Sequence, residues 1–428
     1  MSKIKQVIAR QVLDSNGRPV VETDILTEAG FLGRAGASTG TSVGANESYV
    51  LRDGDPNFWG GMSVMKAVEN VNARIAPALV GLEVQDQEMI DRTMIELDGT
   101  RYKTNLGGNA IFSVSVAAAY AAAAENHKHI YQNVATKPIS YIMSPSANVI
   151  NGGTYNGKTM PWQEFMVLPH GMTDVNESIR IIVEIFYRLG QVLKEMNGGR
   201  PMVGNYSGWA AFSDDPKEVM KVLSQVVADL GYTDKVVYAF DCASSEYYDE
   251  KRGMYLWRGD YVDRNFLIQE LEDLTKTYPI AFVEDALYEE DFEGFKMASE
   301  RLNTVVIGDD FLCTSLDRAK KAVEMGAARG MIFKPNQAGT VTEALETAKY
   351  MIDRGLLVVP SSRAGGTIDS PEKEFGLALG VWAVKTGAPR EGTRVHGFNF
   401  LMHANYELNV PMTDVTKLPT WILRSLPL

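Results

Sequence analysis

The sequence contains only two cysteines in 428 residues, Cys242 and Cys313, and each lies at or just after the end of an apolar run. So few cysteines exclude a disulfide framework, and we expect two buried thiols in a reducing compartment. Positive charge is also scarce, because 42 Lys and Arg stand against 54 Asp and Glu and leave a net charge of -12. This balance argues against a nucleic acid or an anionic membrane surface as the main partner, and leaves room for a small anionic ligand at a locally positive site.

Long apolar runs are missing as well. The longest, Ala110 to Ala124, is rich in alanine and too short to span a bilayer. The opening stretch, MSKIKQVIAR, lacks the apolar core of a signal peptide. We therefore expect a cytoplasmic protein with no membrane partner.

The sequence pattern changes near residue 135. Before it, residues 5–14 and 20–30 have the pattern of two strands in a hairpin, and the alanine-rich run predicts a tightly packed helix. After it, helices alternate with short, continuous apolar runs. We expect an N-terminal α+β domain over residues 1–135 and a larger catalytic α/β domain over residues 136–428.

Six apolar runs of the second region end in a charged residue. These residues are Asp241, Glu284, Asp309, Lys334, Arg363 and Lys385. Continuous apolar strands separated by helices predict a parallel sheet that is covered on both faces. The repetition along so long a chain favours a closed (β/α) barrel, in which catalytic groups gather at the C-terminal ends of the strands. An open doubly wound sheet would place its site there too, but no clear GxGxxG follows a strand.

Three of these residues predict a metal site. Asp241, Glu284 and Asp309 would lie side by side at one mouth of the barrel, where crowded carboxylates resist ionising together. A divalent cation removes that conflict, and oxygen-only ligands favour Mg²⁺. A single acid after a strand is more often a solvated loop residue or helix cap, but three on successive strands indicate a magnesium site.

Two lysines, Lys334 and Lys385, share that mouth. A lysine beside a dication and another lysine has its charged form disfavoured, so we expect its pKa to fall and its amine to act as a base. Removal of the proton α to a carboxylate needs such a base, together with cations that absorb the charge of the anion formed. The pattern thus predicts chemistry on a small anionic carboxylate.

The chain resembles the enolase (phosphopyruvate hydratase) family over almost its whole length. The matching segments are DSNGRPVVE, GASTG, LRDGD, LGGNAI, INGG, QEFM, DCASSE, VED, GDD, KPNQAGT and VKTGAP. The resemblance implies an enolase-type (β/α)8 TIM barrel with modified early strands and an N-terminal α+β capping domain. It also implies two Mg²⁺ ions and proton abstraction by a lysine, which is the established pattern of that superfamily.

The resemblance assigns the metal ligands residue by residue. Asp241, Glu284 and Asp309 correspond to the ligands of the first ion, and Ser38 corresponds to a loop serine that reaches the second. Family members form dimers, so a homodimer or higher homo-oligomer is implied. A family arginine used between subunits has exchanged places with an asparagine here, giving Asn16 and Arg18.

The resemblance also assigns the groups around the substrate. Lys334 corresponds to the base that takes the α-proton, and Lys385 to the lysine that holds the substrate carboxylate. Arg363 corresponds to an arginine on the substrate phosphate. Glu164, with Gln163 before it, corresponds to an acidic residue beside the departing hydroxyl.

One half of the family site is altered. Asn205 and Tyr206 stand where the family has Asp and Glu, and that Glu helps to protonate the departing hydroxide. Tyr155 and Ser362 replace two histidines, and Ala364 replaces a phosphate-binding serine. The two tyrosines are either packing residues of a lid or substrate contacts, and we predict contacts, with Tyr206 as a weak acid because an ordinary tyrosine pKa is about 10.

Three functions are compatible with this pattern. The first is a Mg²⁺-dependent lyase or isomerase acting on a small anionic carboxylate other than 2-phosphoglycerate, such as a phosphonate or a hydroxy acid. The second is a true enolase, converting 2-phosphoglycerate to phosphoenolpyruvate with a substituted acid. The third is a non-catalytic enolase-like binding protein, which the complete set of lysines and metal ligands argues against.

Overall fold

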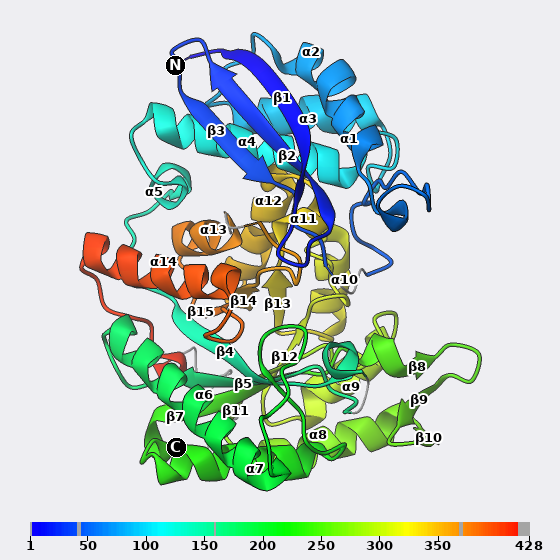
Figure 1. Cartoon of the computed structure of the whole chain (residues 1–428), viewed down its shortest axis with the longest axis vertical. Coiled ribbons are helices and arrows are strands. Elements are labelled where there is room, and N and C mark those ends of the chain that lie inside the picture. Colours follow the sequence, from blue (N-terminus) through cyan, green and yellow to red (C-terminus); the bar gives the residue numbers. More distant parts are fainter. Residues whose placement is uncertain (1, 41–43, 158–159, 368–370, 418–428) are drawn as a thin grey trace.

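The computed structural model describes residues 2–40, 44–157, 160–367 and 371–417. It has a small N-terminal α+β unit, which we call the cap, at one end of the molecule (Figure 1). The opposite end is formed by helices of a larger barrel, among them α7 (Pro216–Asp229) and α8 (Arg264–Thr277). The last cap helix ends at Val134 and the first barrel strand begins at Ser144. We therefore keep the proposed division between residues 135 and 136.

The cap is a three-stranded antiparallel sheet covered by helices. Its first two strands form the predicted hairpin, with Leu13 paired to Pro19 beside the turn. The elements of the cap are β1 (Ile4–Leu13), β2 (Pro19–Thr27), β3 (Leu32–Gly36), α1 (Met65–Asn70), α2 (Ala76–Leu79), α3 (Gln87–Asp98), α4 (Gly108–Glu125) and α5 (Ile130–Val134).

Helix α4 is the predicted alanine-rich helix, and it packs against β2 and β3. At Gly33 in β3, an added Cβ would lie only 2.0 Å from the carbonyl oxygen of Ala117 in the helix. The two backbones therefore meet at a point that has no room for a side chain. Small residues on both elements make this approach, which explains why the helix is rich in alanine.

Eight strands form the barrel, in the order β4-β5-β7-β11-β12-β13-β14-β15. The ring closes because β15 pairs with β4 on one side and Lys385 bridges to Ser361, just after β14, on the other. Strand β5 runs antiparallel to both of its neighbours, whereas the other neighbouring strands run parallel. This is the modification of the early strands that the resemblance implies, and the predicted α/β fold with an enolase-type barrel is confirmed.

The barrel strands are β4 (Ser144–Asn151), β5 (Glu164–Pro169), β7 (Val236–Asp241), β11 (Ile280–Glu284), β12 (Val305–Gly308), β13 (Gly330–Phe333), β14 (Leu357–Pro360) and β15 (Ala383–Lys385). The remaining helices are α6 (Val175–Asn197), α9 (Phe292–Arg301), α10 (Leu316–Met325), α11 (Pro335–Ala338), α12 (Val341–Ile352), α13 (Pro371–Leu379) and α14 (Gly392–Leu408). Short strands lie outside the ring: β6 (Trp209–Ala210), β8 (Tyr248–Asp249), β9 (Met254–Trp257) and β10 (Asp260–Val262).

The start of helix α7 shows how local sequence sets these elements. The Asp215 carboxylate accepts a hydrogen bond from the backbone N–H of Lys217 at 2.8 Å, and Pro216 occupies the first turn, as predicted. The helix ends before Gly231, which has a φ of 73°. Such capping fixes where each helix begins and ends, and so where each strand meets the barrel mouth.

Apolar side chains fill the inside of the barrel. One buried cluster comes almost entirely from barrel strands and includes Met166, Ala239, Ile307, Ile332 and Val359. A larger cluster joins the outer faces of the strands to the helices and to the cap. The barrel is thus a packed core rather than a pore, which leaves the ends of the strands for polar chemistry.

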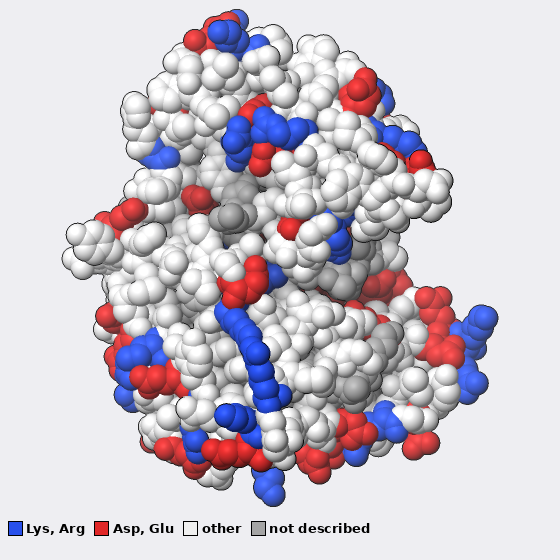
Figure 2. All heavy atoms as spheres, viewed as in Figure 1, with Lys and Arg blue, Asp and Glu red and all other residues white. Residues whose placement is uncertain are grey.

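Charged side chains of both signs are interspersed on the face of the molecule in Figure 2. Cys242 and Cys313 are buried and free, as predicted. Among the described helices, none combines the length and the apolar character needed to cross a bilayer.

Candidate active site

The predicted strand-end residues meet at one mouth of the barrel. Asp241, Glu284 and Lys385 are the last residues of β7, β11 and β15, whereas Asp309 and Lys334 directly follow β12 and β13. The three carboxylates and Lys385 are at most 6% exposed, and the Lys334 side chain is 12% exposed. The barrel therefore places all five groups on a rigid and largely dry frame.

Lys385 lies at the centre of this group. Its Nζ is 2.6 Å from Glu284 Oε2, 3.0 Å from Glu164 Oε2 and 3.1 Å from Asp241 Oδ2. Burial disfavours the ammonium, but these carboxylates outweigh burial and raise the pKa of Lys385 well above its usual value.

Lys334 contacts a carboxylate of Asp309. Burial again opposes the charge, yet Asp309 raises the pKa of Lys334 above its usual value. The expectation that these lysines have lowered pKa values is therefore wrong for the site as the structure shows it. The reason is that each ammonium lies against carboxylates whose charge it neutralises.

The carboxylates fit a divalent cation. They supply only oxygen, which suits Mg²⁺, and burial raises the pKa of Glu284 well above its usual range. Within the described residues, Glu284 Oε1 is buried and lacks a hydrogen-bond partner. A buried carboxylate oxygen without a donor is costly, and a cation ligated there would satisfy it. Glu284 is thus suited to hold an ion, whereas Asp241 and Asp309 are paired with Lys385 and Lys334 in this structure. Among the described residues, the three acids with oxygens within 4.8 Å of one another are Asp285, Asp309 and Asp310.

Asp285 binds the backbone of the loop that carries Asp309, one of the metal-ligand candidates. Its carboxylate accepts hydrogen bonds from the backbone N–H groups of Asp309 at 2.9 Å and of Asp310 at 2.8 Å. Burial, with Asp309 nearby, raises the pKa of Asp285 to about 8. The strand-end pattern does not single out Asp285, and its signal in the sequence is the second acid of the VED segment. Because Asp285 oxygens bind the backbone of this loop, they orient Asp309.

Glu164 reaches the mouth because β5 is antiparallel. Glu164 is the first residue of β5, and in an antiparallel strand the first residue lies beside the last residues of the neighbouring strands. Glu164 therefore pairs with Asn151 of β4 and Asp241 of β7. Burial raises the pKa of Glu164, even though Lys385 opposes the shift. Gln163, one residue earlier, donates from Nε2 to Asp241 Oδ2 at 3.3 Å. Both predicted residues therefore lie in the site.

The cap completes one wall of the mouth. Glu47 of the cap forms a buried, two-pronged ion pair with Arg363, with N–O distances of 2.9 and 3.1 Å. Gln337 donates to Asp309 Oδ1 at 2.9 Å and to Glu47 Oε1 at 3.3 Å. Neither residue ends a strand, so the strand-end pattern gave no signal for them, although Gln337 lies in the matching segment KPNQAGT.

A cap loop also reaches this wall. Thr39 pairs with Gly365 through two backbone hydrogen bonds of 2.9 and 3.0 Å. Arg18 donates to the backbone oxygens of Thr39 and Gly40, both at 3.2 Å. Ser38 lies in this loop and is half-buried, but no hydrogen bond joins it to the three carboxylates within the described part of the chain.

The two tyrosines form a stack at the mouth. Tyr155 and Tyr206 have ring centroids 5.1 Å apart and nearly parallel planes, and the Arg394 guanidinium lies 3.9 Å from the Tyr206 centroid. Ala364 packs against both tyrosines. Burial raises the pKa of each tyrosine, so both hydroxyls are neutral at ordinary pH. The Tyr206 hydroxyl donates to the backbone oxygen of Ser362 at 2.9 Å, which already commits its proton.

The small cavity at this mouth brings together most of the predicted residues. Its lining is Gly40, Tyr155, Gln163, Glu164, Tyr206, Asp241, Lys334, Ser361, Ser362, Arg363, Ala364 and Lys385. Glu284 and Asp309 join it through their ion pairs with Lys385 and Lys334. Ser38 alone among the predicted site residues is neither in the lining nor bonded to it among the described residues.

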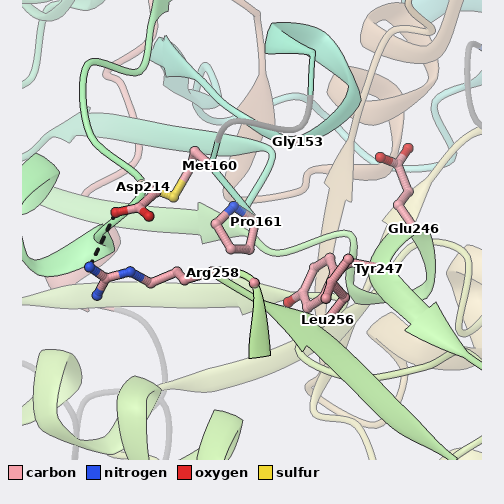
Figure 3. Close-up of a pocket in the computed structure, with 9 residues that line it drawn as sticks. Gly153, Met160, Pro161, Asp214, Glu246, Tyr247, Leu256 and Arg258 are labelled. Carbon is pink, nitrogen blue, oxygen red and sulfur yellow. Dashed lines mark ion pairs between the residues drawn. The ribbon is translucent and has the colours of Figure 1, made fainter. Parts of the chain in front are cut away.

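A second cavity, of about 280 Å³, has Gly153, Met160 and Pro161 in its lining (Figure 3). Gly153 and Pro161 form one wall, and Arg258, paired with Asp214 at 3.2 Å, forms another. Glu246, which also lines this cavity, accepts a hydrogen bond from the Thr154 hydroxyl at 2.9 Å. Thr154, the neighbour of Tyr155 in the sequence, is thus anchored to a residue that lines this cavity.

Comparisons with known proteins match the sequence along both parts of the chain. The family model described as "Enolase, N-terminal domain" matches residues 4–134, and "Enolase, C-terminal TIM barrel domain" matches residues 140–413. The protein named Enolase of Methanopyrus kandleri is 41% identical over 413 residues, covering 95% of this chain and 96% of its own length. The Enolase of Methanococcus maripaludis is 39% identical over 409 residues, with the same coverage. This chain belongs to the enolase family.

Proposed function

We propose that this protein is a Mg²⁺-dependent carbon–oxygen lyase that removes the proton α to the carboxylate of a small anionic substrate. The observation that carries the proposal is the convergence of Lys334, Lys385 and three buried carboxylates at one barrel mouth. An amine base and a set of oxygen ligands are the two requirements of that reaction.

Asp241, Glu284 and Asp309 would hold the ion, and Ser38 is proposed to reach a second one. Bound Mg²⁺ would supply the positive charge that stabilises the carboxylate of the reacting anion. It would also neutralise the charge of Asp309, which otherwise stabilises the ammonium form of Lys334. In this arrangement the Nζ amine of Lys334 accepts the α-proton of the substrate. Lys385 holds the substrate carboxylate.

The groups that handle the rest of the substrate come from neighbouring positions. Arg363 is proposed to bind the second anionic group, because its guanidinium is fixed by Glu47. Glu164 is proposed as the acid for the departing hydroxide, since burial favours its protonated form. Tyr155 and Ser362 line the same cavity, with Gln163 beside Glu164, and are proposed as substrate contacts.

The first candidate substrate is 2-phosphoglycerate, which would be converted to phosphoenolpyruvate. The relatives named Enolase, at about 40% identity over 95% of the chain, support this candidate better than they support another substrate. We expect slow turnover, because the family's acidic loop residue is Tyr206 here, and a lost general acid costs about 10²–10⁴ in rate.

The second candidate is another small anionic carboxylate, a phosphonate or a hydroxy acid. The observation that favours it is the stack of Tyr155, Tyr206 and Ala364 at the mouth. This stack places two neutral phenol rings and a methyl group where the family has ionisable groups.

The direct test is an assay for phosphoenolpyruvate with 2-phosphoglycerate, with and without Mg²⁺. The proposal expects product that depends on Mg²⁺ and is lost in Lys334→Ala. Turnover of a phosphonate or hydroxy acid with the same two dependences, and none of 2-phosphoglycerate, would select the second candidate. Turnover that survives in Lys334→Ala would contradict the proposed base.

We further propose that the protein acts in the cytoplasm as a homodimer or higher homo-oligomer, as the family resemblance implies. Arg18 is engaged inside its own chain with Asp14, Thr39 and Gly40. Subunit contacts of this protein would therefore have to use other residues. Light scattering of the purified protein measures the oligomeric state, and a mass of one chain would contradict the proposal.

A further inference from the structure

Helix α13 contains a fully buried lysine beside the candidate active site. Lys373 is 1% exposed, and its side chain shares the inner face of the helix with Leu377, one turn later. Lysine is almost never fully buried without a partner. Its Nζ contacts the Ser362 hydroxyl and lies 3.3 Å from Glu372 Oε1.

The contact fixes the hydrogen-bonding role of Ser362. A lysine ammonium has only donors, so Ser362 Oγ must accept from Lys373. The backbone oxygen of Ser362 accepts from Tyr206, which holds the residue from a second side. The hydroxyl hydrogen of Ser362 is then left to donate elsewhere, and Ser362 lines the mouth cavity.

The neighbours of this hydroxyl are cationic. Arg363 is the next residue, and Lys334 and Lys385 line the same cavity. Ala364, one position further, has no hydroxyl, whereas Ser361, Ser362 and Arg363 all carry side-chain donors and line the cavity. An anionic oxygen is the acceptor that such surroundings select.

A second buried lysine provides a contrast. Lys103 of the cap is 3% exposed, and its Nζ forms an ion pair with Glu343 at 3.0 Å. Its partner is a carboxylate, so its charge is balanced locally. Lys373 also pairs with a carboxylate, Glu372, at 3.3 Å, but its closest contact is the neutral Ser362 hydroxyl.

We propose that Ser362 and Lys373 form an anion subsite, in which Ser362 donates to an oxyanion of the substrate and Lys373 is the positioning residue that orients the hydroxyl. The inference rests on the proposed function and deepens it. It adds the Ser362 hydroxyl as a donor to the second anionic group that Arg363 is proposed to bind. A substrate with the carboxylate as its only anionic group would leave this donor unused.

The test uses inorganic phosphate as the probe, titrated calorimetrically into the full-length protein in the presence of Mg²⁺. Ser362→Ala and Lys373→Met should each weaken phosphate binding about 10-fold, the effect of losing a hydrogen bond to a charged group. The double variant should be little weaker than either single variant, because both changes disable one donor. Lys373→Arg should restore part of the affinity.

The matched control is Lys103→Met, which removes the other buried lysine and should lower the melting temperature without changing phosphate binding. If Lys373→Met does not fold, Ser362→Ala and Lys373→Arg still decide the question. Failure of the wild type to bind phosphate, or binding by Lys373→Met equal to the wild type, would overturn the proposal. Phosphate binding needs no turnover, so an inactive protein that binds phosphate in this way would contradict the proposed function and leave the subsite standing.

Discussion

The two sides of the active-site mouth differ in how their residues are held. On the strand side, Asp241, Glu284 and Lys385 are themselves the last residues of barrel strands, and Asp309 and Lys334 follow directly. On the loop side, Tyr155, Tyr206 and Ser362 come from connecting segments, and Lys373 comes from a helix behind them. The first set is fixed by sheet hydrogen bonds, whereas the second is fixed by contacts between loops, such as the backbone bond from Asn205 to Tyr155 at 2.8 Å and the hydrogen bond from Tyr206 to Ser362.

This difference explains which half of the site departs from the family pattern. A strand-end residue cannot change its direction without disturbing the barrel, so the chemistry that needs a fixed geometry belongs there. Loop residues can be exchanged while the scaffold stays intact, and loops therefore carry specificity. We infer that proton abstraction resides on the strand side and that substrate choice and departure of the leaving group reside on the loop side.

The largest effect is expected from Lys334→Ala, because it removes the base from the strand side. Turnover should fall by about 10⁴-fold, the upper range for loss of a general base. A matched control is Lys349→Ala, which removes an exposed lysine that pairs with Asp353 on helix α12. Steady-state assays with the Mg²⁺-loaded protein measure both. An active Lys334→Ala would show that the strand side does not contain the base.

Metal binding on the strand side is tested by Asp309→Ala. Mg²⁺ at 100 times its dissociation constant should stabilise the wild type by about 2.7 kcal/mol and raise its melting temperature. Asp309→Ala should lose most of that response, because it removes one of three proposed ligands. Asp353→Ala, which removes an exposed carboxylate, should keep it. Equal Mg²⁺ responses in Asp309→Ala and the wild type would remove Asp309 from the ligand set.

Glu164→Gln separates the two chemical steps. If Glu164 is the acid, product formation should fall by about 10²-fold while exchange of the α-proton with solvent continues. The amide keeps the shape of the side chain, so the contact with Lys385 changes in charge but not in size. Proton NMR in D₂O follows exchange and product together. Parallel loss of both signals would point to a role in binding rather than as the acid.

The smallest effect is expected from Tyr206→Phe. Its hydroxyl already donates to the Ser362 carbonyl, so its removal should cost one hydrogen bond, about 1 kcal/mol or a five-fold change in turnover. The ring, and with it the stack on Tyr155, is retained. A loss near 10²-fold in product, with exchange intact, would instead identify Tyr206 as the acid and place it ahead of Glu164.

The same contrast shows what the sequence could predict. The strand side was predictable, because apolar runs that end in Asp241, Glu284, Asp309, Lys334 and Lys385 encode both the strand and its terminal group. The barrel class and the hairpin of the cap followed from similar local patterns.

The loop side depended on tertiary contacts that no local pattern records. Glu47 enters the site only because the cap packs on the barrel, and Gln337 only because α11 turns toward Asp309. Lys373 had a weak signal, namely a lysine in phase with buried positions of α13. The raised lysine pKa values also required the structure, since they depend on which carboxylate each ammonium contacts.

The most direct test of this account compares exchange with product formation in the wild type. The protein is incubated with 2-phosphoglycerate and Mg²⁺ in D₂O, and NMR records deuterium at the α-carbon and the appearance of phosphoenolpyruvate. With the strand side intact and the loop side altered, deuterium should enter the substrate faster than product forms, and Lys334→Ala should abolish both signals. Product formation without any deuterium entering the remaining substrate, at the rate of an efficient enzyme, would contradict the division of labour between the two sides.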